Sequence, residues 1–160
     1  IEISAEGKII RAMLDEIPGY PGRIRRRPTG GFWLAIFAPR SPLIEFVLRE
    51  PGYRKSMLAE LAPEHWIAPS YISGRSFHEP LQGGALKQMG ILKPWAPTRS
   101  YGLVVEIDAD FIPQRSFHSR SGGKRHGITS ALEHEGTLWL ISRGCCEVLA
   151  MPLNTQGESA

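Results

Sequence analysis

The stretch GYPGRIRRRPTGGFWLAI, residues 19–36, decides the fold of this chain. It passes from a Pro/Gly turn into an arginine-rich segment, and then through Gly30-Gly31 into an apolar segment around Trp33. Two segments joined by a short glycine-containing turn are typical of a β-hairpin. The stretch therefore predicts a strand, a tight turn and a second strand, with a cluster of arginines before the turn.

The chain nearly repeats a pattern in which a hairpin is followed by a tryptophan-bearing strand. Residues 1–13 (IEISAEGKIIRAM) match residues 105–117 (VEIDADFIPQRSF), and each copy reads as strand, acidic turn and strand. A glycine turn and a strand around Trp33 follow the first copy, and a glycine turn and a strand around Trp139 follow the second. The repeat predicts an all-β fold of four-stranded antiparallel sheets, best matched by a β-propeller, with both tryptophans in the core.

A long insertion separates the two copies and divides the chain into four parts. We expect residues 1–38 to be one propeller-blade segment, 39–97 a helical and irregular insertion, 98–153 the last blade segment, and 154–160 a disordered polar tail. Two blades cannot close into a ring, and an open ring leaves sheet edges exposed. The chain is therefore expected to be the C-terminal part of a larger protein, whose remaining blades are required.

The first half of the insertion has the pattern of helices. Ser41 can cap a helix and Pro42 can occupy its first turn. Apolar residues recur at helical spacing on both sides of a Pro51-Gly52 break, namely Leu43, Ile44, Phe46, Val47, Met57, Leu58 and Leu61. We expect the first of these apolar faces to pack on the propeller, with docking on a membrane as the alternative. The second half, rich in glycine, proline and serine, is expected to be a lid or an irregular loop over the rim.

Composition narrows the class of function. The 160 residues are 42% hydrophobic and carry a formal net charge of +3. This mild balance does not suit a nucleic-acid binder, whose positive charge is usually larger and gathered on one face. The sequence has no apolar run long enough to span a bilayer and no signal-peptide pattern, so the compartment is unassigned. The adjacent Cys145 and Cys146 are interpreted as small buried hydrophobes at the end of a strand.

Three segments carry a family resemblance: GYPGRIRRRPTGGFWLAI, YGLVVEIDAD and GITSALEHEGTLWLIS. Together with the helical insertion after FWLAIFAPR, they resemble the strictosidine-synthase-like proteins, including the adipocyte plasma membrane-associated group, within the gluconolactonase and calcium-dependent phosphotriesterase superfamily. The resemblance implies a six-bladed propeller, of which this chain holds roughly the last third to half. It also implies a lactonase- or arylesterase-like hydrolase working in a central channel, and it allows a membrane tether in the part before Ile1.

The resemblance further implies a cation in the channel, commonly calcium, and here the sequence departs from the family. The family form of the opening motif is Gly-Tyr-Pro-Asp-Asn-Ile, but Gly22 and Arg23 replace its two oxygen-bearing residues. Hard cations require oxygen ligands, and a guanidinium repels them. We therefore expect a degraded metal site with no ligand from this chain, and the cofactor is unassigned.

The catalytic glutamate of true strictosidine synthases also lacks a counterpart here. Its position, a few residues before the turn at residues 133–136, is occupied by Thr129 or Ser130. Neither hydroxyl can act as a carboxylate base, so strictosidine synthase chemistry is not expected. Thr129 and Ser130 are the candidate catalytic residues for a hydrolase, although Ser130 lacks the Gly-x-Ser-x-Gly frame of a nucleophile. Glu133 and His134 are interpreted as turn structure.

Arg23 and His126 are the candidate substrate-binding residues. Arg23 occupies the channel position of the family, whereas the neighbouring arginines Arg25, Arg26 and Arg27 are interpreted as solvated side chains along a blade edge. His126 precedes the last inner strand and can contact an anion or act as a base at the channel mouth. The alternative for His126 is an exposed loop histidine.

Two hypotheses about function follow. In the first, the protein is an enzyme of the superfamily that acts on a small organic substrate in the channel. In the second, Arg23 has replaced the cation, and the propeller is a non-catalytic module that recognises an acidic small molecule or a protein partner. Calcium-dependent turnover would favour the first, and anion binding weakened by Arg23→Ala would favour the second.

Overall fold

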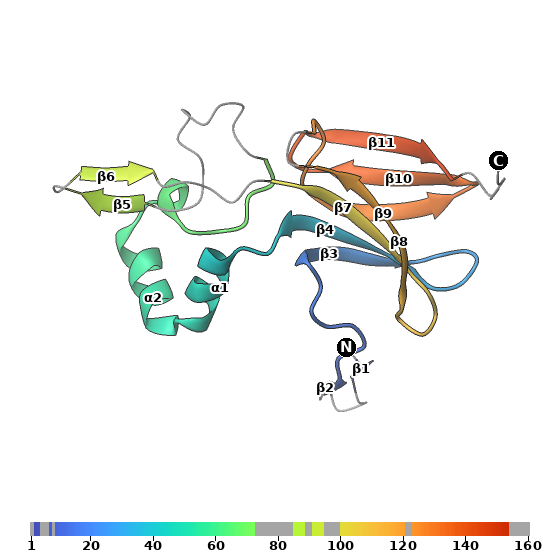
Figure 1. Cartoon of the computed structure of the whole chain (residues 1–160), viewed down its shortest axis with the longest axis horizontal. Helices are drawn as coiled ribbons and strands as arrows, with labels where there is room; N and C mark the ends of the chain where they lie inside the picture. The colour runs from blue at the N-terminus through green and yellow to red at the C-terminus, as the bar shows by residue number, and fades with distance from the viewer. Residues whose placement is uncertain are drawn as a thin grey trace.

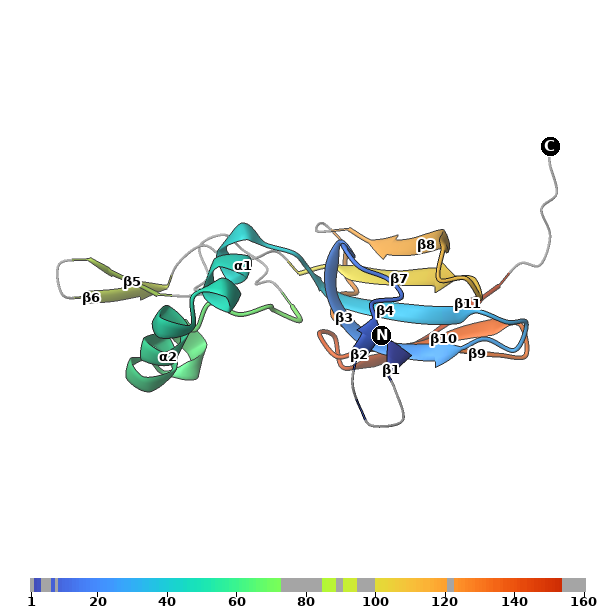
Figure 2. The ribbon, with the colours of Figure 1, turned by 90° about the horizontal axis from the view of Figure 1, so that it is seen from below.

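The computed structural model describes residues 2–3, 7, 9–72, 85–88, 91–94, 100–120 and 123–153. Its elements in chain order are β1 (Glu2–Ile3), β2 (Ile9–Arg11), β3 (Gly19–Arg26), β4 (Phe32–Pro39), α1 (Pro42–Arg49), α2 (Pro51–Glu60), the 3-10 turn η1 (Pro63–His65), β5 (Ala85–Gln88), β6 (Ile91–Pro94), β7 (Gly102–Ile107), β8 (Pro113–Ser119), β9 (Ile128–His134), β10 (Thr137–Ser142) and β11 (Glu147–Pro152). Two antiparallel sheets lie against each other, and the helical insertion extends from one end of them (Figure 1 and Figure 2).

The two larger sheets confirm the predicted strands but not their grouping. The first sheet has the order β3–β4–β7–β8 and the second has the order β9–β10–β11. The predicted hairpins are present as β1–β2 and β7–β8, and Gly30, Gly31 and Gly136 have the positive φ angles of tight turns, 97°, 72° and 68°. Because β4 pairs with β7 across the insertion, the first sheet combines strands from both copies of the sequence repeat. Residues 98–153 consequently contribute to both sheets.

The core lies between the two sheets and follows the two-residue period of their strands. It is formed by Trp33, Ala35, Val104, Ile128, Ala131, Leu138, Leu140 and Leu153. The next residues along β4, Leu34 and Ile36, are buried on the other face of the same sheet. A central strand that is buried on both faces reads as a continuous apolar run, which explains the sequence FWLAIFA.

The two repeat-equivalent tryptophans have different environments. Trp33 is fully buried between the sheets, whereas Trp139 is 43% exposed, so the prediction that both are core residues is wrong for Trp139. Trp139 lies on the outer face of the second sheet, where Leu132, Ile141 and Val148 are also exposed. In a propeller each sheet packs against the sheets on both sides of it. An exposed apolar face of this kind is typical of a surface that packs against another layer.

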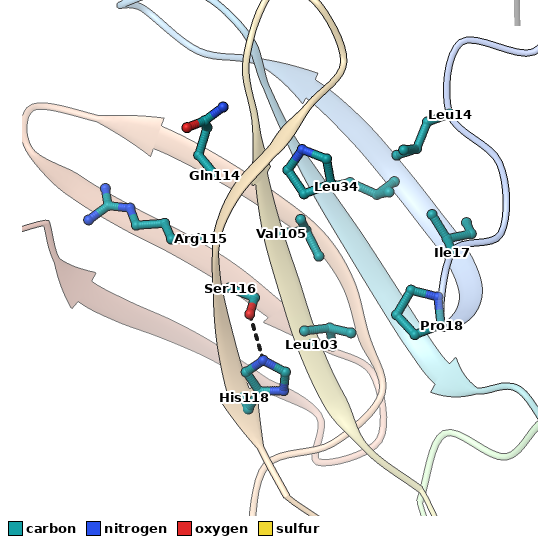
Figure 3. A pocket seen from close by; sticks show the side chains of 11 residues that line it. Leu14, Ile17, Pro18, Leu34, Leu103, Val105, Gln114, Arg115, Ser116 and His118 are labelled. Atoms are coloured by element: carbon teal, nitrogen blue, oxygen red, sulfur yellow. Dashed lines mark hydrogen bonds between the residues drawn. The ribbon is translucent and has the colours of Figure 1, made fainter.

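The outward face of the first sheet is partly covered by the segment before β3. Leu14 and Ile17 point toward Leu34, Leu103 and Val105 of the sheet, as Figure 3 shows. A hollow of about 310 Å³ remains between this segment and β8. Its lining is mostly apolar, as expected of a surface that packs against another layer.

The helical half of the insertion is confirmed. Pro42 and Pro51 each occupy the first turn of a helix, while the Ser41 side chain makes no capping hydrogen bond. The buried apolar residues of α1, Ile44 and Val47, pack with Met57 of α2 and with Ile67, and Tyr20 of β3 packs against the same cluster. The apolar face of α1 is thus used mainly within the insertion.

A polar contact ties the insertion to the first sheet. The Tyr20 hydroxyl of β3 donates a hydrogen bond to Glu45 Oε1 of α1 at 2.8 Å, and Arg40 Nη2 lies 3.2 Å from Glu45 Oε2. Burial of Tyr20, followed by its hydrogen bond to Glu45 and the charge of that carboxylate, raises the pKa of Tyr20 to about 12. The hydrogen bonds from Tyr20 and Arg40 lower the pKa of Glu45.

The second half of the insertion contains a short hairpin, β5–β6, which the expected irregular loop did not include. Residues 73–84, 89–90 and 95–99, and the tail at 154–160, lie outside the described residues, so the lid and the disordered tail stay predictions. Within the described ranges, neither helix has the length and apolar composition that crossing a membrane requires.

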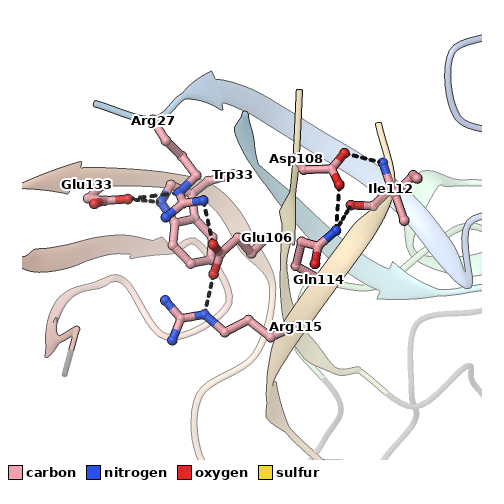
Figure 4. A network of polar contacts seen from close by, with 8 residues as sticks. All are labelled: Arg27, Trp33, Glu106, Asp108, Ile112, Gln114, Arg115 and Glu133. Atoms are coloured by element: carbon pink, nitrogen blue, oxygen red, sulfur yellow. Dashed lines mark hydrogen bonds and ion pairs between the residues drawn. The ribbon is translucent and has the colours of Figure 1, made fainter. Parts of the chain in front are cut away.

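An ion-pair network joins the two sheets at the end opposite the insertion (Figure 4). Arg27 pairs with Glu106 of β7 and, at 3.1 Å, with Glu133 of β9; Arg115 also pairs with Glu106. Trp33 Nε1 donates to Glu133 Oε2 at 2.8 Å. Arg27 is therefore not a solvated side chain, and Glu133 is not a turn residue, because both are built into the contact between sheets. Arg25 and Arg26 are exposed, as predicted.

Candidate functional site

A pocket opens at the end of the sheets from which the insertion departs. Its volume is about 440 Å³, and its lining consists of Pro21, Gly22, Arg23, Phe37, Tyr71, Thr129, Ser130, Ile141 and Arg143. The structure thus brings together three of the four predicted site residues, Arg23, Thr129 and Ser130, which lie on the adjacent strands β3 and β9. The residues that line the pocket come from both sheets and from the insertion.

Irregularities in the strand pairing aim side chains into this pocket. Between Pro21 and Ile24, strand β3 has one residue more than the paired part of β4. Two residues, Gly22 and Arg23, therefore lie opposite a single residue of β4. The register also skips Phe37 on β4 and Thr129 on β9. An extra residue of this kind bends a strand and redirects its side chains, and such bulges are common beside functional sites.

Gly22 allows the two sheets to approach each other at the pocket. A Cβ atom at this position would lie 2.7 Å from the carbonyl oxygen of Thr129, closer than side-chain carbons approach backbone atoms. Gly22, at a position where the family resemblance implies an oxygen ligand, therefore has a packing role. Glycine here lets β3 and β9 lie against each other with Arg23 beside Thr129 and Ser130.

The pocket carries two guanidinium groups. Within the described residues, no hydrogen bond or ion pair engages Arg23, whose side chain is exposed toward the pocket. Arg143, in the turn after β10, stacks on the Tyr71 ring at 4.7 Å from its centroid, and its Nη1 donates to the Tyr71 hydroxyl at 3.3 Å. Neither contact supplies a negative charge, so the described lining is electropositive.

These residues do not fit the cation that the family resemblance implies. The described lining offers guanidinium, hydroxyl and ring groups but no carboxylate or imidazole. Across the described ranges, no group of three or more His, Cys, Asp or Glu side chains is placed to hold a metal ion. Calcium and similar ions require several oxygen ligands, preferably carboxylates, and two positive charges oppose their binding.

The hydroxyl residues are the hydrogen-bonding groups next to Arg23. Thr129 Oγ1 donates to the carbonyl oxygen of Ile141 at 3.4 Å, and Ser130 is buried at the edge of the pocket. The described structure provides no histidine or carboxylate at hydrogen-bonding distance from either hydroxyl. Thr129 and Ser130 can therefore orient a ligand, but activation of either as a nucleophile would need a base from outside the described residues.

His126 does not belong to this pocket. It is 5% exposed, its Nδ1 lies 2.6 Å from Ser100 Oγ, and its Nε2 lies 2.8 Å from the carbonyl oxygen of Arg120. Because a carbonyl oxygen only accepts, Nε2 carries the proton of that bond. The exposed-loop alternative is therefore wrong, and the placement of His126 at the channel mouth stays a prediction. The residue holds together the segment that leads into β9.

Sequence reasoning missed Phe37, Tyr71 and Arg143. Phe37 looked like one residue of an apolar strand, and its bulged position gives no signal in the sequence. Tyr71 lies in the insertion, far along the chain from the other lining residues. Arg143 is followed by Cys145 and Cys146, a pair that was expected to be buried; Cys146 is instead exposed and Cys145 half-buried, because they form the turn between β10 and β11.

Comparison with curated proteins gives relatives that match most of this chain. The adipocyte plasma membrane-associated protein of Salmo salar is 31% identical over 129 residues, which are 81% of this chain and 25% of the relative. Its counterpart in Danio rerio is 32% identical over the same shares of each chain. Protein STRICTOSIDINE SYNTHASE-LIKE 2 of Arabidopsis thaliana is 25% identical over 142 residues, 88% of this chain and 29% of the relative. The chain belongs to this strictosidine-synthase-like family.

Membership of the strictosidine-synthase-like family agrees with the sheets. The two packed antiparallel sheets are part of a β-propeller, and β3 and β9 are neighbouring strands at the pocket. The chain spans about a quarter of the length of these relatives. Searches against family models and against solved structures gave no match.

Proposed function

We propose that this strictosidine-synthase-like chain forms one wall of a propeller pocket that binds a small organic anion. The observation that carries the proposal is the uncompensated charge of Arg23 and Arg143 in one concave site. Two like charges in such a site repel each other, and an anion bound there relieves that repulsion. A guanidinium also donates two parallel hydrogen bonds to a carboxylate or phosphate, which makes arginine well suited to this role.

The other lining residues support a small organic ligand. A volume of about 440 Å³ lies within the usual range of small-molecule pockets. Phe37 and Ile141 give an apolar surface, while Thr129 and Ser130 add hydroxyl groups beside Arg23. The described lining is divided between polar and apolar side chains, so the polar groups can fix the orientation of a ligand whose body packs on the apolar part.

Hydrolysis of a lactone or aryl ester is the second candidate function. It is favoured by the hydroxyls of Thr129 and Ser130, which lie in the same pocket as Arg23. In such a reaction the guanidinium would stabilise the negative charge that develops on the carbonyl oxygen. The base that activates a nucleophile or water would have to come from the part of the propeller outside this chain.

The test uses the full-length protein and separates the two functions. Calcium binding and the hydrolysis of phenyl acetate and γ-butyrolactone are measured alongside calorimetric titration with an aromatic carboxylate, 2-naphthoate. We expect 2-naphthoate to bind and Arg23→Ala to weaken it at least about tenfold, since a charged hydrogen-bonding group is lost. Arg25→Ala is the matched control, because it removes the same charge from the same strand outside the pocket.

Turnover of either ester that requires calcium and survives in the Arg23→Ala variant would replace the binding proposal with the hydrolase. Equal affinity for 2-naphthoate in the wild type and in the Arg23→Ala variant would remove Arg23 from the site altogether. A third outcome is that Arg23→Ala reduces both ester turnover and 2-naphthoate affinity, while Arg25→Ala changes neither. This result would assign both hydrolysis and anion binding to this pocket.

A further inference from the structure

Tyr71 is delivered to the pocket by the helical insertion. The helices α1 and α2 pack on each other through Ile44, Val47 and Met57, and Ile67 of the following segment completes that cluster. Tyr71 follows four residues later and lies against the second sheet. The insertion therefore has a defined structural consequence, which is an aromatic ring beside Arg23 and Thr129.

The backbone of Tyr71 packs closely against two glycines, Gly127 and Gly144. A Cβ atom on Gly127 would lie 2.6 Å from the Tyr71 carbonyl oxygen, and a Cβ on Gly144 would meet the same oxygen at an impossible separation. Gly127 also has a φ of 63°, which favours glycine. Glycines are thus required at two places, one before β9 and one after β10, for the insertion to pass this closely. The close packing of its backbone fixes Tyr71 in the wall of the pocket.

Three flat groups meet on this wall. The rings of Tyr71 and Phe37 lie 5.1 Å apart between centroids, at an interplanar angle of 37°. The guanidinium of Arg143 lies over the Tyr71 ring, 4.7 Å from its centroid. Aromatic rings and guanidinium planes favour other flat π systems as neighbours, through offset or edge contacts and through cation–π attraction. A saturated ring of the same size gains only burial of its surface.

The two arginines therefore have different roles. Arg143 is held against Tyr71 by stacking and by the hydrogen bond to its hydroxyl. Arg23 has no hydrogen bond or ion pair within the described residues and can direct its whole donor edge to a ligand. We propose, resting on the anion-binding function above, that the ligand is an aromatic or planar conjugated carboxylic acid. Its flat body packs against Phe37, Tyr71 and Arg143, and its carboxylate binds Arg23.

The experiment compares two acids with the same carbon skeleton and charge, one aromatic and flat and the other saturated. The full-length protein is titrated calorimetrically with 2-naphthoate and with trans-decahydro-2-naphthoate, which carry the same charge on the same ring framework. We expect the aromatic acid to bind about fivefold or more tightly, from the contacts of its π system. Tyr71→Leu and Phe37→Leu should each reduce that preference, mainly by weakening 2-naphthoate, while Tyr71→Phe should retain most of it.

Tyr53→Leu is the matched control, because Tyr53 is a half-exposed tyrosine of the same insertion that packs on Phe46, away from the pocket. It should leave the preference unchanged. Equal binding of the two acids to the wild type, or a preference that survives in both leucine variants, would overturn the inference. The wild-type comparison needs no substitution, so it stands even if one variant fails to fold.

The outcomes also separate this inference from the proposed function. If both acids bind equally and Arg23→Ala weakens both, the pocket binds anions and only its selectivity for planar acids is rejected. If neither acid binds to the wild type, the proposed function and this inference fail together. If the aromatic acid is preferred and Tyr71→Leu alone removes the preference, the insertion is the part of the fold that determines specificity.

Discussion

Arg23 and Arg27 lie four residues apart, yet the molecule uses them in opposite ways. Arg27 follows β3 directly, pairs with Glu106 and Glu133, and lies 5.2 Å from the centroid of the Trp33 ring. Arg23 lies within β3, in a pocket whose described lining has no carboxylate. The charge of Arg27 is balanced by carboxylates that link the two sheets. The charge of Arg23 is not balanced by any described lining residue and is available to a ligand. The acidic residues around an arginine, rather than the arginine itself, decide which role it has.

The bulge on β3 accounts for part of this difference. In a regular strand, residues two apart share a face, so Arg23, Arg25 and Arg27 would point the same way. The extra residue between Pro21 and Ile24 breaks that alternation at Arg23. Arg23 faces the pocket beside Thr129 and Ser130 of β9, whereas Arg27 reaches Glu133 near the end of the same strand.

The largest effect should come from Arg27→Ala. This change leaves Glu106 and Glu133 largely buried without their shared cation, so the free energy of unfolding should fall by about 3 kcal/mol. Thermal and denaturant unfolding of the full-length protein measure the effect. Arg25→Ala, which removes an exposed arginine next to the network, should change stability by less than about 0.5 kcal/mol. Equal effects of the two substitutions would mean that the network adds nothing to the contact between sheets.

Gly22→Val should have the next largest effect. The new Cβ would lie 2.7 Å from the Thr129 carbonyl, which belongs to the backbone and cannot rotate away, so the two sheets must separate. We expect a loss of about 2 kcal/mol in stability and roughly tenfold weaker anion binding, because Arg23 moves with the strand. Gly52→Ala is the matched control, since a Cβ at that position meets no atom within 4 Å. Unchanged binding by Gly22→Val would contradict the close packing of β3 on β9.

A smaller effect concerns the anchor of the insertion. The pKa of Tyr20 is raised to about 12 by burial and by Glu45, so the neutral hydroxyl is stabilised in the folded protein. Its contribution to stability is therefore complete below about pH 10 and disappears as the pH rises through about 12. The pKa of Glu45 is lowered, so its contribution is present at neutral pH and is lost only in acid, as the pH falls through the lowered value.

Absorbance titration at 295 nm tests this assignment. The wild-type protein should show a tyrosine that ionises near pH 12, and Tyr20→Phe should remove that step alone. If the step near pH 12 persists in Tyr20→Phe, the hydrogen bond between Tyr20 and Glu45 does not anchor the insertion as described.

Much of the fold could be predicted because its signals are local. Glycine turns at Gly30-Gly31 and Gly136 and the strands beside them are visible in short stretches of sequence. The helix starting at Pro42 is likewise encoded by its own residues. The assignment of strands to sheets was less accessible, since β4 pairs with β7 across the whole insertion. The exposure of Trp139 depends on what covers its sheet, which a repeat pattern alone does not contain.

The sequence pointed to residues of the candidate pocket only where the family motif reaches it. Arg23, Thr129 and Ser130 do meet in one pocket, but Tyr71 and Arg143 join it through contacts between segments distant in the chain. The partners of Arg27 were missed for the same reason. One signal was available in that case: Glu106 lies inside the apolar strand VVEI, and a carboxylate in such a strand requires a buried cation.

The central claim is that Arg23 supplies the charge that binds an organic anion in this pocket. Calorimetric titration of the full-length protein with 2-naphthoate, comparing Arg23→Gln with Arg25→Gln, tests it most directly, because glutamine keeps a hydrogen-bond donor and loses the charge. We predict at least about tenfold weaker binding for Arg23→Gln and unchanged binding for Arg25→Gln. Equal affinities in both variants and the wild type would contradict the claim.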